Sequence, residues 1–176
     1  AAAAQQYKHA AATRPDYCFP FQLESADVLR AAMARNPADA RAPYYLGNLL
    51  YDLQPEAAVK LWERSRELDG AFATVHRNLA FAYARMEGDS GKAVASLERA
   101  VACDPQDPRL LAELDAQYEA ANVDPARRLA MLEKHESAVR RRDEALLRLV
   151  SLNTLMERYD RAIELMANHH FRLWEG

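Results

Sequence analysis

Two ladders of residues recur at one spacing along most of the chain, and this spacing is the strongest constraint on its fold. In the first ladder a leucine begins a patch of small residues, at Leu46, Leu79, Leu114 and Leu149, with intervals of 33, 35 and 35 residues. The second ladder is Ser25, Ala58, Ala93, Arg128 and Ala162, with intervals of 33, 35, 35 and 34 residues. A period of about 34 residues accommodates two helices of about 13 residues and two short turns. The ladders therefore predict stacked helix pairs.

The composition agrees with helices and argues against a sheet. Alanine contributes 35 of the 176 residues and leucine 22, whereas valine, isoleucine and threonine together contribute only 8 + 1 + 3 = 12. Sheets draw on β-branched residues, so this content is too low for a sheet protein. Four residues after each member of the second ladder lies an apolar residue: Leu29, Trp62, Leu97, Leu132 and Met166. Apolar residues at this spacing lie on one face of a helix.

We predict an all-α fold, an α-α superhelix of about ten helices in five antiparallel pairs. The expected helices span residues 1–14, 23–36, 40–52, 55–69, 72–86, 90–103, 108–121, 125–137, 140–157 and 159–170. Asp107-Pro108 and Asp124-Pro125 each have the pattern of an N-cap followed by proline in the first turn, and Ser90 is expected to cap a third helix. Small residues at Gly47 and Ala80 predict close approach between the two helices of a pair, and stacking of the pairs completes the core.

Two central stretches resemble the tetratricopeptide repeat (TPR). The first contains Tyr45-Leu46-Gly47, Leu50, Ala58, Trp62, Ser65 and Gly70; the second contains Leu79-Ala80, Tyr83, Ala93, Leu97, Ala100 and Pro105. The third unit departs from the pattern, because Asp115 and His135 replace small residues and Arg128 replaces the alanine. The resemblance implies a single TPR solenoid domain over residues 1–176. Its expected parts are a degenerate first pair (1–39) and repeats over 40–72, 73–107, 108–142 and 143–176.

The two ends carry a further resemblance. The stretches 16–21 (DYCFPF) and 171–176 (FRLWEG) resemble boxes that bracket the TPR region of large bacterial proteins. In those proteins an N-terminal β-rich domain similar to carbohydrate-processing enzymes comes first. The family has a proline before the closing tryptophan, where this chain has Leu173. Together with the missing initiator methionine, the boxes predict that the chain is a fragment of a longer protein.

Motifs for phosphate and zinc chemistry are incomplete. The stretch 88–93 has the Gly-Lys pair of a phosphate-binding loop, but the first glycine of that loop would fall at Met86, and Ala93 has no hydroxyl for magnesium. His135 begins a pattern like that of zinc proteases, but the second histidine would fall at Val139. We therefore predict no catalytic residue, metal site or cofactor.

The remaining histidines and cysteines favour structural roles. His169 and His170 are adjacent, so on a helix their side chains point about 100° apart and cannot chelate one ion together. We expect them to stabilise a helix C-terminus, where positive charge is favoured. Cys18 and Cys103 fit no metal-binding spacing, and both are expected to be packed residues.

Charge and hydropathy exclude two classes of partner. The chain has 23 basic and 26 acidic residues, so its net charge of −3 argues against a nucleic-acid role based on a basic face and leaves only local basic patches open. The basic run 140–142 is followed at once by Asp143 and Glu144. No apolar run approaches the roughly 20 residues that cross a bilayer, and the first ten residues lack the apolar core of a secretory signal. The sequence thus predicts a cytoplasmic protein with neither a nucleic-acid nor a membrane partner.

Binding of a protein or peptide is the function that remains. The first helices of the pairs are expected to line a concave groove. The expected groove residues are Arg41, Tyr44, Asn48, Tyr51, Asp52, Thr74, Arg77, Phe81, Arg85 and Arg109. Tyrosine and arginine dominate interface energetics, and asparagine can pair with a peptide backbone. Three alternatives stay open: groove residues that only meet solvent or one another, a helical accessory region packed in cis on a carbohydrate-active domain, and a homo-oligomeric scaffold.

Overall fold

The computed structural model describes residues 2–12 and 20–172, and within these ranges the chain forms helices and no strands. The predicted all-α class is therefore confirmed. The chain divides into two compact units, Ala1–Ala82 (unit 1) and Tyr83–Gly176 (unit 2). The prediction of a single domain with five helix pairs stays a prediction, and the two units are described in turn.

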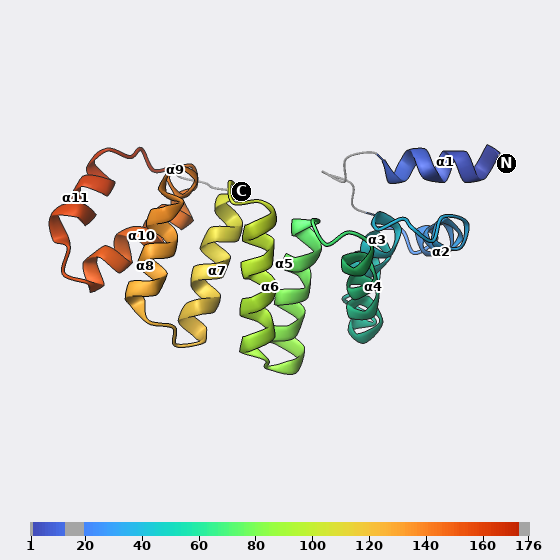
Figure 1. The fold of residues 1–176 in the computed structure, drawn as a ribbon, viewed down its shortest axis with the longest axis horizontal. Coiled ribbons are helices and arrows are strands. Elements are labelled where there is room, and N and C mark those ends of the chain that lie inside the picture. Colours follow the sequence, from blue (N-terminus) through green and yellow to red (C-terminus); the bar gives the residue numbers. More distant parts are fainter. Residues whose placement is uncertain (1, 13–19, 173–176) are drawn as a thin grey trace. The chain divides into compact units, whose positions relative to one another are not determined.

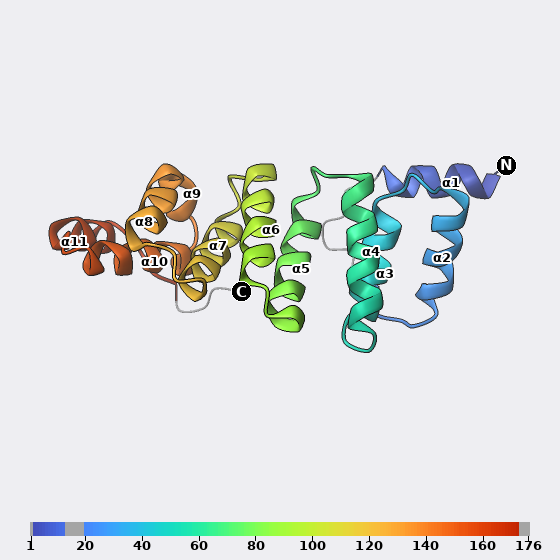
Figure 2. The same ribbon diagram turned by 60° about the horizontal axis from the view of Figure 1, so that its bottom comes forward.

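Unit 1 contains five helices that pack in chain order. They are α1 (Ala2–Ala11), α2 (Ser25–Arg35), α3 (Arg41–Leu50), α4 (Pro55–Leu68) and α5 (Ala73–Ala82). Each contacts the helix that follows it, and α3 and α4 lie side by side as the most extensive pair of the unit (Figures 1 and 2). Proline begins α4, where its missing N–H removes no intrahelical hydrogen bond.

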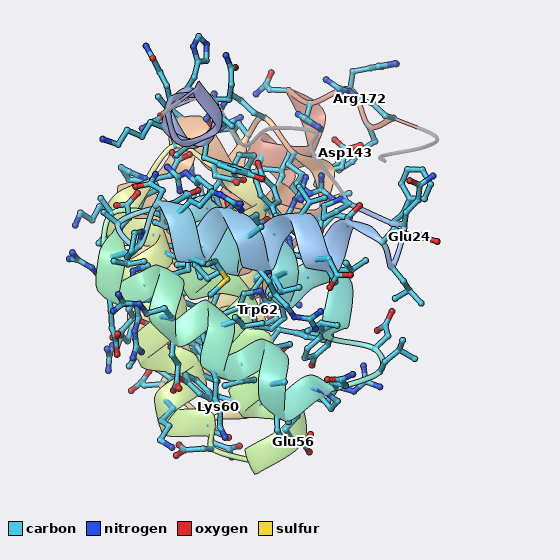
Figure 3. The ribbon with its side chains drawn as sticks, turned by 90° about the vertical axis from the view of Figure 1, so that its right-hand side faces the viewer. Glu24, Glu56, Lys60, Trp62, Asp143 and Arg172 are labelled. Atoms are coloured by element: carbon cyan, nitrogen blue, oxygen red, sulfur yellow. The ribbon has the colours of Figure 1, made fainter. Side chains whose placement is uncertain are left out.

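The contact between α3 and α4 depends on a glycine opposite a tryptophan. A Cβ atom on Gly47 would lie 2.5 Å from Trp62 Nε1, so only glycine fits while the indole keeps this position. This confirms the predicted close approach at Gly47. The Trp62 side chain is buried within the unit (Figure 3), and nearby the Ser65 hydroxyl donates a 2.6 Å hydrogen bond to the carbonyl oxygen of Ala40. The three TPR-like positions of α4, Ala58, Trp62 and Ser65, thus face the core.

Unit 2 begins with a short π-helix. Its elements are η1 (Tyr83–Glu87), α6 (Ser90–Cys103), α7 (Pro108–Ala120), α8 (Pro125–Lys134), α9 (Glu136–Val139), α10 (Asp143–Leu155) and α11 (Tyr159–Ala167). Helix α7 packs against α6, α8 and α10, and α11 packs against α10 (Figure 1). Helix α10 therefore connects the last helix to the middle of the unit.

Helix starts in unit 2 follow local chemistry, with one correction. The carboxylates of Asp107 and Asp124 accept hydrogen bonds from the backbone N–H groups two residues on, at 2.8 and 2.7 Å, which confirms both predicted N-caps. The predicted cap at Ser90 is wrong, because Asp89 accepts from Lys92 N at 2.9 Å instead. Ser90 is already the first residue of α6, whereas a capping oxygen must come from the residue outside the helix.

Several predicted helix boundaries also differ from the structure, and three of them have an identifiable cause. The helix expected over 72–86 is α-helical only to Ala82 and continues as a π-helix, since apolar spacing does not distinguish the two turns. The helix expected over 125–137 ends at Lys134, because the backbone of His135 leaves helical geometry. The helix expected over 140–157 begins at Asp143, an acidic residue in the first turn where the helix dipole favours negative charge.

Two of the three departures from the TPR pattern in unit 2, Asp115 and Arg128, form one buried ion pair. Arg128 Nε and Nη2 donate to the two oxygens of Asp115 at 2.9 and 3.0 Å, and Asp115 is fully buried. Arg148 Nη1 donates to Asp115 Oδ2 at 3.0 Å. The hydrogen bonds to Asp115 hold the pKa of Arg128 above its ordinary value. A charge network therefore joins α7, α8 and α10 at positions where the repeat pattern has small residues.

Candidate functional site

An asparagine on α3 connects three helices of unit 1. Asn48 Oδ1 accepts hydrogen bonds from Trp62 Nε1 on α4 at 3.0 Å and from Asn78 Nδ2 on α5 at 2.9 Å. The indole N–H also lies 3.3 Å from the carbonyl oxygen of Tyr44. Because both acceptor sites of Oδ1 are used, the chemistry left to Asn48 is donation through its amide Nδ2.

Aromatic rings continue this arrangement toward solvent. Tyr51, directly after α3, has its ring centroid 4.9 Å from that of buried Trp62 and 6.2 Å from that of Phe81 on α5. Phe81 is 57% exposed, and Tyr51 is half-buried. We call Asn48, Tyr51, Asn78 and Phe81 the α3/α5 surface. It presents amide groups and aromatic rings, and buried Trp62 contacts two of its members, Asn48 and Tyr51.

Two of the predicted groove residues pack against the core: Tyr44 is buried, and Arg41 is half-buried. Tyr44 is only 6% exposed, and its ring packs edge-on against Phe72 at 4.7 Å, so it is corrected to a core residue. The Arg41 guanidinium lies 3.7 Å from the Phe72 ring centroid, and its Nη2 pairs with Asp69 Oδ2 at 3.3 Å. Arg41 therefore stabilises the start of α3 and the loop before α5.

The other predicted groove residues are divided between the two units. Thr74 and Arg77 are half-buried on α5, and Asp52 is exposed next to Tyr51. Arg85 and Arg109 are exposed and belong to unit 2, whereas the α3/α5 surface belongs to unit 1.

Sequence reasoning missed Asn78 and the polar role of Trp62. Trp62 was predicted from the ladder as an apolar core residue. A buried indole N–H, however, requires an acceptor, and that requirement is the signal that could have linked it to Asn48. Asn78 lies three residues before Phe81 on α5, and this spacing places the two side chains on the same face.

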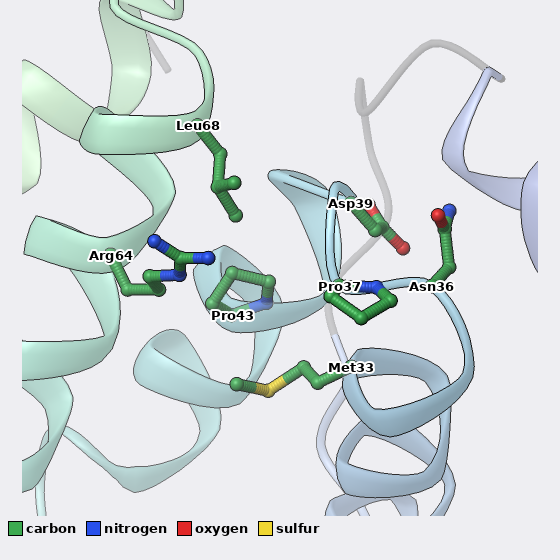
Figure 4. A pocket seen from close by; sticks show the side chains of 7 residues that line it. All are labelled: Met33, Asn36, Pro37, Asp39, Pro43, Arg64 and Leu68. Atoms are coloured by element: carbon green, nitrogen blue, oxygen red, sulfur yellow. The ribbon is translucent and has the colours of Figure 1, made fainter.

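A small cavity lies elsewhere in unit 1, between the end of α2 and helices α3 and α4 (Figure 4). Its volume is about 120 Å³, and its lining residues are Met33, Asn36, Pro37, Asp39, Pro43, Arg64 and Leu68. Asp39 is already engaged, since its Oδ1 accepts from the backbone N–H groups of Arg41 and Ala42 at 2.8 and 3.3 Å. Ligand pockets usually measure about 300–1,000 Å³, so this cavity has room for one side chain only.

The predicted role of His169 is corrected by a contact in unit 2. His169 Nε2 lies 2.6 Å from Asp143 Oδ1, and the Arg172 backbone N–H donates to Asp143 Oδ2 at 2.7 Å (Figure 3). The hydrogen bond from His169 has the largest effect on the pKa of Asp143, and the one from the Arg172 backbone has the next largest. Together they hold this pKa below its ordinary value. The histidine therefore pairs with the first residue of α10 rather than with a helix C-terminus, while His170 is exposed.

The remaining sequence predictions concern metal sites, membrane-spanning helices, the two cysteines and the two end boxes. Within residues 2–12 and 20–172, no three His, Cys, Asp or Glu side chains gather in a way that could hold a metal ion. Over the same residues no helix is both long and apolar enough to cross a membrane. Cys103 is half-buried, and Cys18 lies outside the described residues. Most of the two end boxes, residues 16–19 and 173–176, also lies outside them.

Comparison with known proteins identifies the fold. No protein-family model matches the chain. The crystal structure of YrrB, a TPR protein with an unusual peptide-binding site, superposes with a TM-score of 0.66 at 20% identity, over 81% of this chain and 73% of YrrB. PilF of Pseudomonas aeruginosa gives 0.65 at 20% identity, over 85% and 69%. MamA from Desulfovibrio magneticus RS-1 gives 0.62 at 16% identity, over 93% and 91%. The chain therefore has the fold of the tetratricopeptide-repeat proteins.

Proposed function

We propose that the chain is a protein-interaction scaffold whose α3/α5 surface binds an extended peptide of a partner protein, without catalysis of its own. The observation that carries this proposal is the half-exposed pair Tyr51 and Phe81 beside the amide of Asn48. Aromatic residues that present large, rigid area are typical anchors of protein interfaces. The similarity in fold to YrrB, a TPR protein with a peptide-binding site, supports the same conclusion.

The chemistry of the surface favours a peptide backbone with an apolar side chain. Asn48 accepts from Trp62 and Asn78, so its Nδ2 group is oriented to donate to a carbonyl oxygen of the ligand. The exposed ring of Phe81 offers a face for an apolar ligand side chain. Trp62 fixes the side chain of Asn48 through a hydrogen bond and that of Tyr51 through ring contact. Because both side chains are already ordered, little conformational entropy is lost on binding.

Peptide display followed by two substitutions tests this function. Peptides selected on the unaltered protein are measured against Phe81→Ala and Asn48→Asp by isothermal titration calorimetry. Asn48→Asp keeps the oxygen that accepts from Trp62 but removes the donor. We expect each variant to weaken binding by about tenfold or more, as truncation of an interface anchor does.

The matched control is Val28→Ala, a change at an exposed apolar residue on α2 of the same unit. It is expected to leave the affinity unchanged. Selected peptides that bind Phe81→Ala and Asn48→Asp as tightly as the unaltered protein would show that the α3/α5 surface is not the binding site.

A further inference from the structure

The last helix of unit 2 exposes an apolar stripe. Tyr159, Ile163 and Met166 are 57%, 65% and 49% exposed, and Leu155 at the end of α10 is 61% exposed. Residues at positions i, i+4 and i+7 of α11 lie on one face of the helix. Large apolar side chains that gather on one exposed face mark interaction surfaces, whereas isolated ones are normal.

The repeat ladder allows Met166 to be compared with the corresponding residues of the earlier helices. Met166 occupies the same ladder position as Trp62, Leu97 and Leu132, which are 3%, 5% and 0% exposed. The helices that carry those three residues each pack against a helix that comes later in the chain: α4 against α5, α6 against α7, and α8 against α10. Among the described helices none follows α11. Trp62 itself packs on α3, the preceding helix, so the ladder position alone does not indicate which helix covers α11. The exposed residues of α11 have the i, i+4, i+7 spacing with which one helix packs against another.

The charges beside the stripe are acidic. Asp160 and Glu164 follow Tyr159 and Ile163 and lie on one flank of the stripe, and Glu157 is exposed in the preceding turn. Arg161 is already engaged, since it pairs with Glu164 at 2.7 Å and with Glu136 at 2.6 Å. Asp160 and Glu157 form no ion pair within the described residues. This flank thus keeps uncompensated negative charge.

We propose that the α11 face, defined by Tyr159, Ile163 and Met166, binds an amphipathic helix of a partner protein that carries lysine or arginine along one flank. Helix-in-groove recognition uses anchors at this spacing, and complementary charge selects the partner and its orientation. A second copy of this chain fits less well. Two α11 helices packed antiparallel about a two-fold axis would bring Asp160 of one against the acidic flank of the other.

Two synthetic helical peptides of about 18 residues test the proposal. Both carry leucine at the i, i+4, i+7 and i+11 positions; one has lysine along a flank, and the other has glutamate there. Fluorescence anisotropy with the full chain is expected to show about tenfold tighter binding of the lysine peptide. Ile163→Asp is expected to abolish this binding. The double change Glu157→Lys and Asp160→Lys is expected to reverse the preference.

Controls separate this face from the α3/α5 surface and from misfolding. Val28→Asp, at an exposed apolar residue of α2, and Phe81→Ala are expected to leave binding of the lysine peptide unchanged. Ile163→Ser and circular dichroism show whether the loss of binding occurs in a folded protein. The proposal is overturned if neither peptide binds or if the flank charge has no effect. It is also overturned if light scattering shows a dimer that Ile163→Asp dissociates, since a second copy would then occupy the face.

Discussion

Among the glycines that the structure describes, Gly47 has the least room for a larger side chain. A methyl group there would lie 2.5 Å from Trp62 Nε1, and the indole cannot move away without losing its hydrogen bond to Asn48. We expect Gly47→Ala to lower the free energy of unfolding by about 1–3 kcal/mol through overpacking, even though alanine favours the helix. Urea denaturation measures this change. Gly70→Ala is the control, because its Cβ would meet only the Arg66 carbonyl oxygen at 3.8 Å, and it is expected to change the free energy by less than about 0.5 kcal/mol.

The buried pair Asp115 and Arg128 predicts strong coupling between two single substitutions. Replacing either residue by alanine removes two hydrogen bonds between charged groups, while Asp115 keeps its contact with Arg148 and Arg128 keeps its contact with Glu119, so each change is expected to cost about 1–3 kcal/mol. The double substitution restores the small residues of the repeat pattern and removes both charges. We therefore expect it to cost about 1–3 kcal/mol less than the sum of the two single changes. If the changes in free energy of unfolding measured in urea for the two single substitutions add up to that of the double substitution, Asp115 and Arg128 are not coupled.

The residue scale also shows where sequence reasoning succeeds and where it stops. Phe81 and Tyr51 were predicted as groove residues from helical spacing; their ring centroids lie 6.2 Å apart and Phe81 is exposed, while their role in a groove stays a prediction. Tyr44 was predicted on the same grounds but is buried, because Phe72, from the loop before α5, covers it. Spacing within one helix indicates a face, but it does not indicate what packs on that face.

At the scale of elements, the segment after α11 is held to the first residue of α10 through Asp143. The folded-state pKa of Asp143 lies below its ordinary value of 3.8, so the carboxylate contributes stability above that pH. This contribution is lost as the pH falls through 3.8 and then through the lower folded value, because the protonated acid no longer accepts both hydrogen bonds.

We expect Asp143→Asn to reduce the loss of stability below the ordinary pKa of Asp143. Thermal melts followed by circular dichroism between neutral and acid pH measure the difference. Asp160→Asn, a change at an exposed carboxylate of the same unit, is the control and is expected to keep the dependence of the unaltered protein. An identical acid dependence in Asp143→Asn and the unaltered protein would show that this contact adds nothing.

Helix starts were predicted better than helix ends for a local reason. An Asp-Pro pair supplies both the capping oxygen and the first helical residue, so α7 and α8 begin where the sequence places them. No comparable local signal marks the change to a π-helix after Ala82 or the short helix α9.

At the scale of the whole molecule, the division into two units predicts local rather than uniform loss of stability. In repeat proteins, stability is close to a sum of contributions from repeats and from the contacts between neighbours. We expect Gly47→Ala to accelerate amide hydrogen exchange in α3 and α4 and to leave α7 and α10 unchanged. Native-state hydrogen exchange measured by mass spectrometry tests this. A uniform acceleration in both units would instead indicate one cooperative fold.

The sequence by itself determined the all-helical class, the period near 34 residues and most helix starts. These features follow from local propensity, caps and apolar spacing, which act between residues a few positions apart. Only the tertiary structure decided which polar groups meet. Asn48 reaches Trp62 and Asn78, and Asp115 reaches Arg128, across separate helices. The exposure of Ile163 and the burial of Tyr44 were decided in the same way, because burial depends on which neighbouring element covers a face.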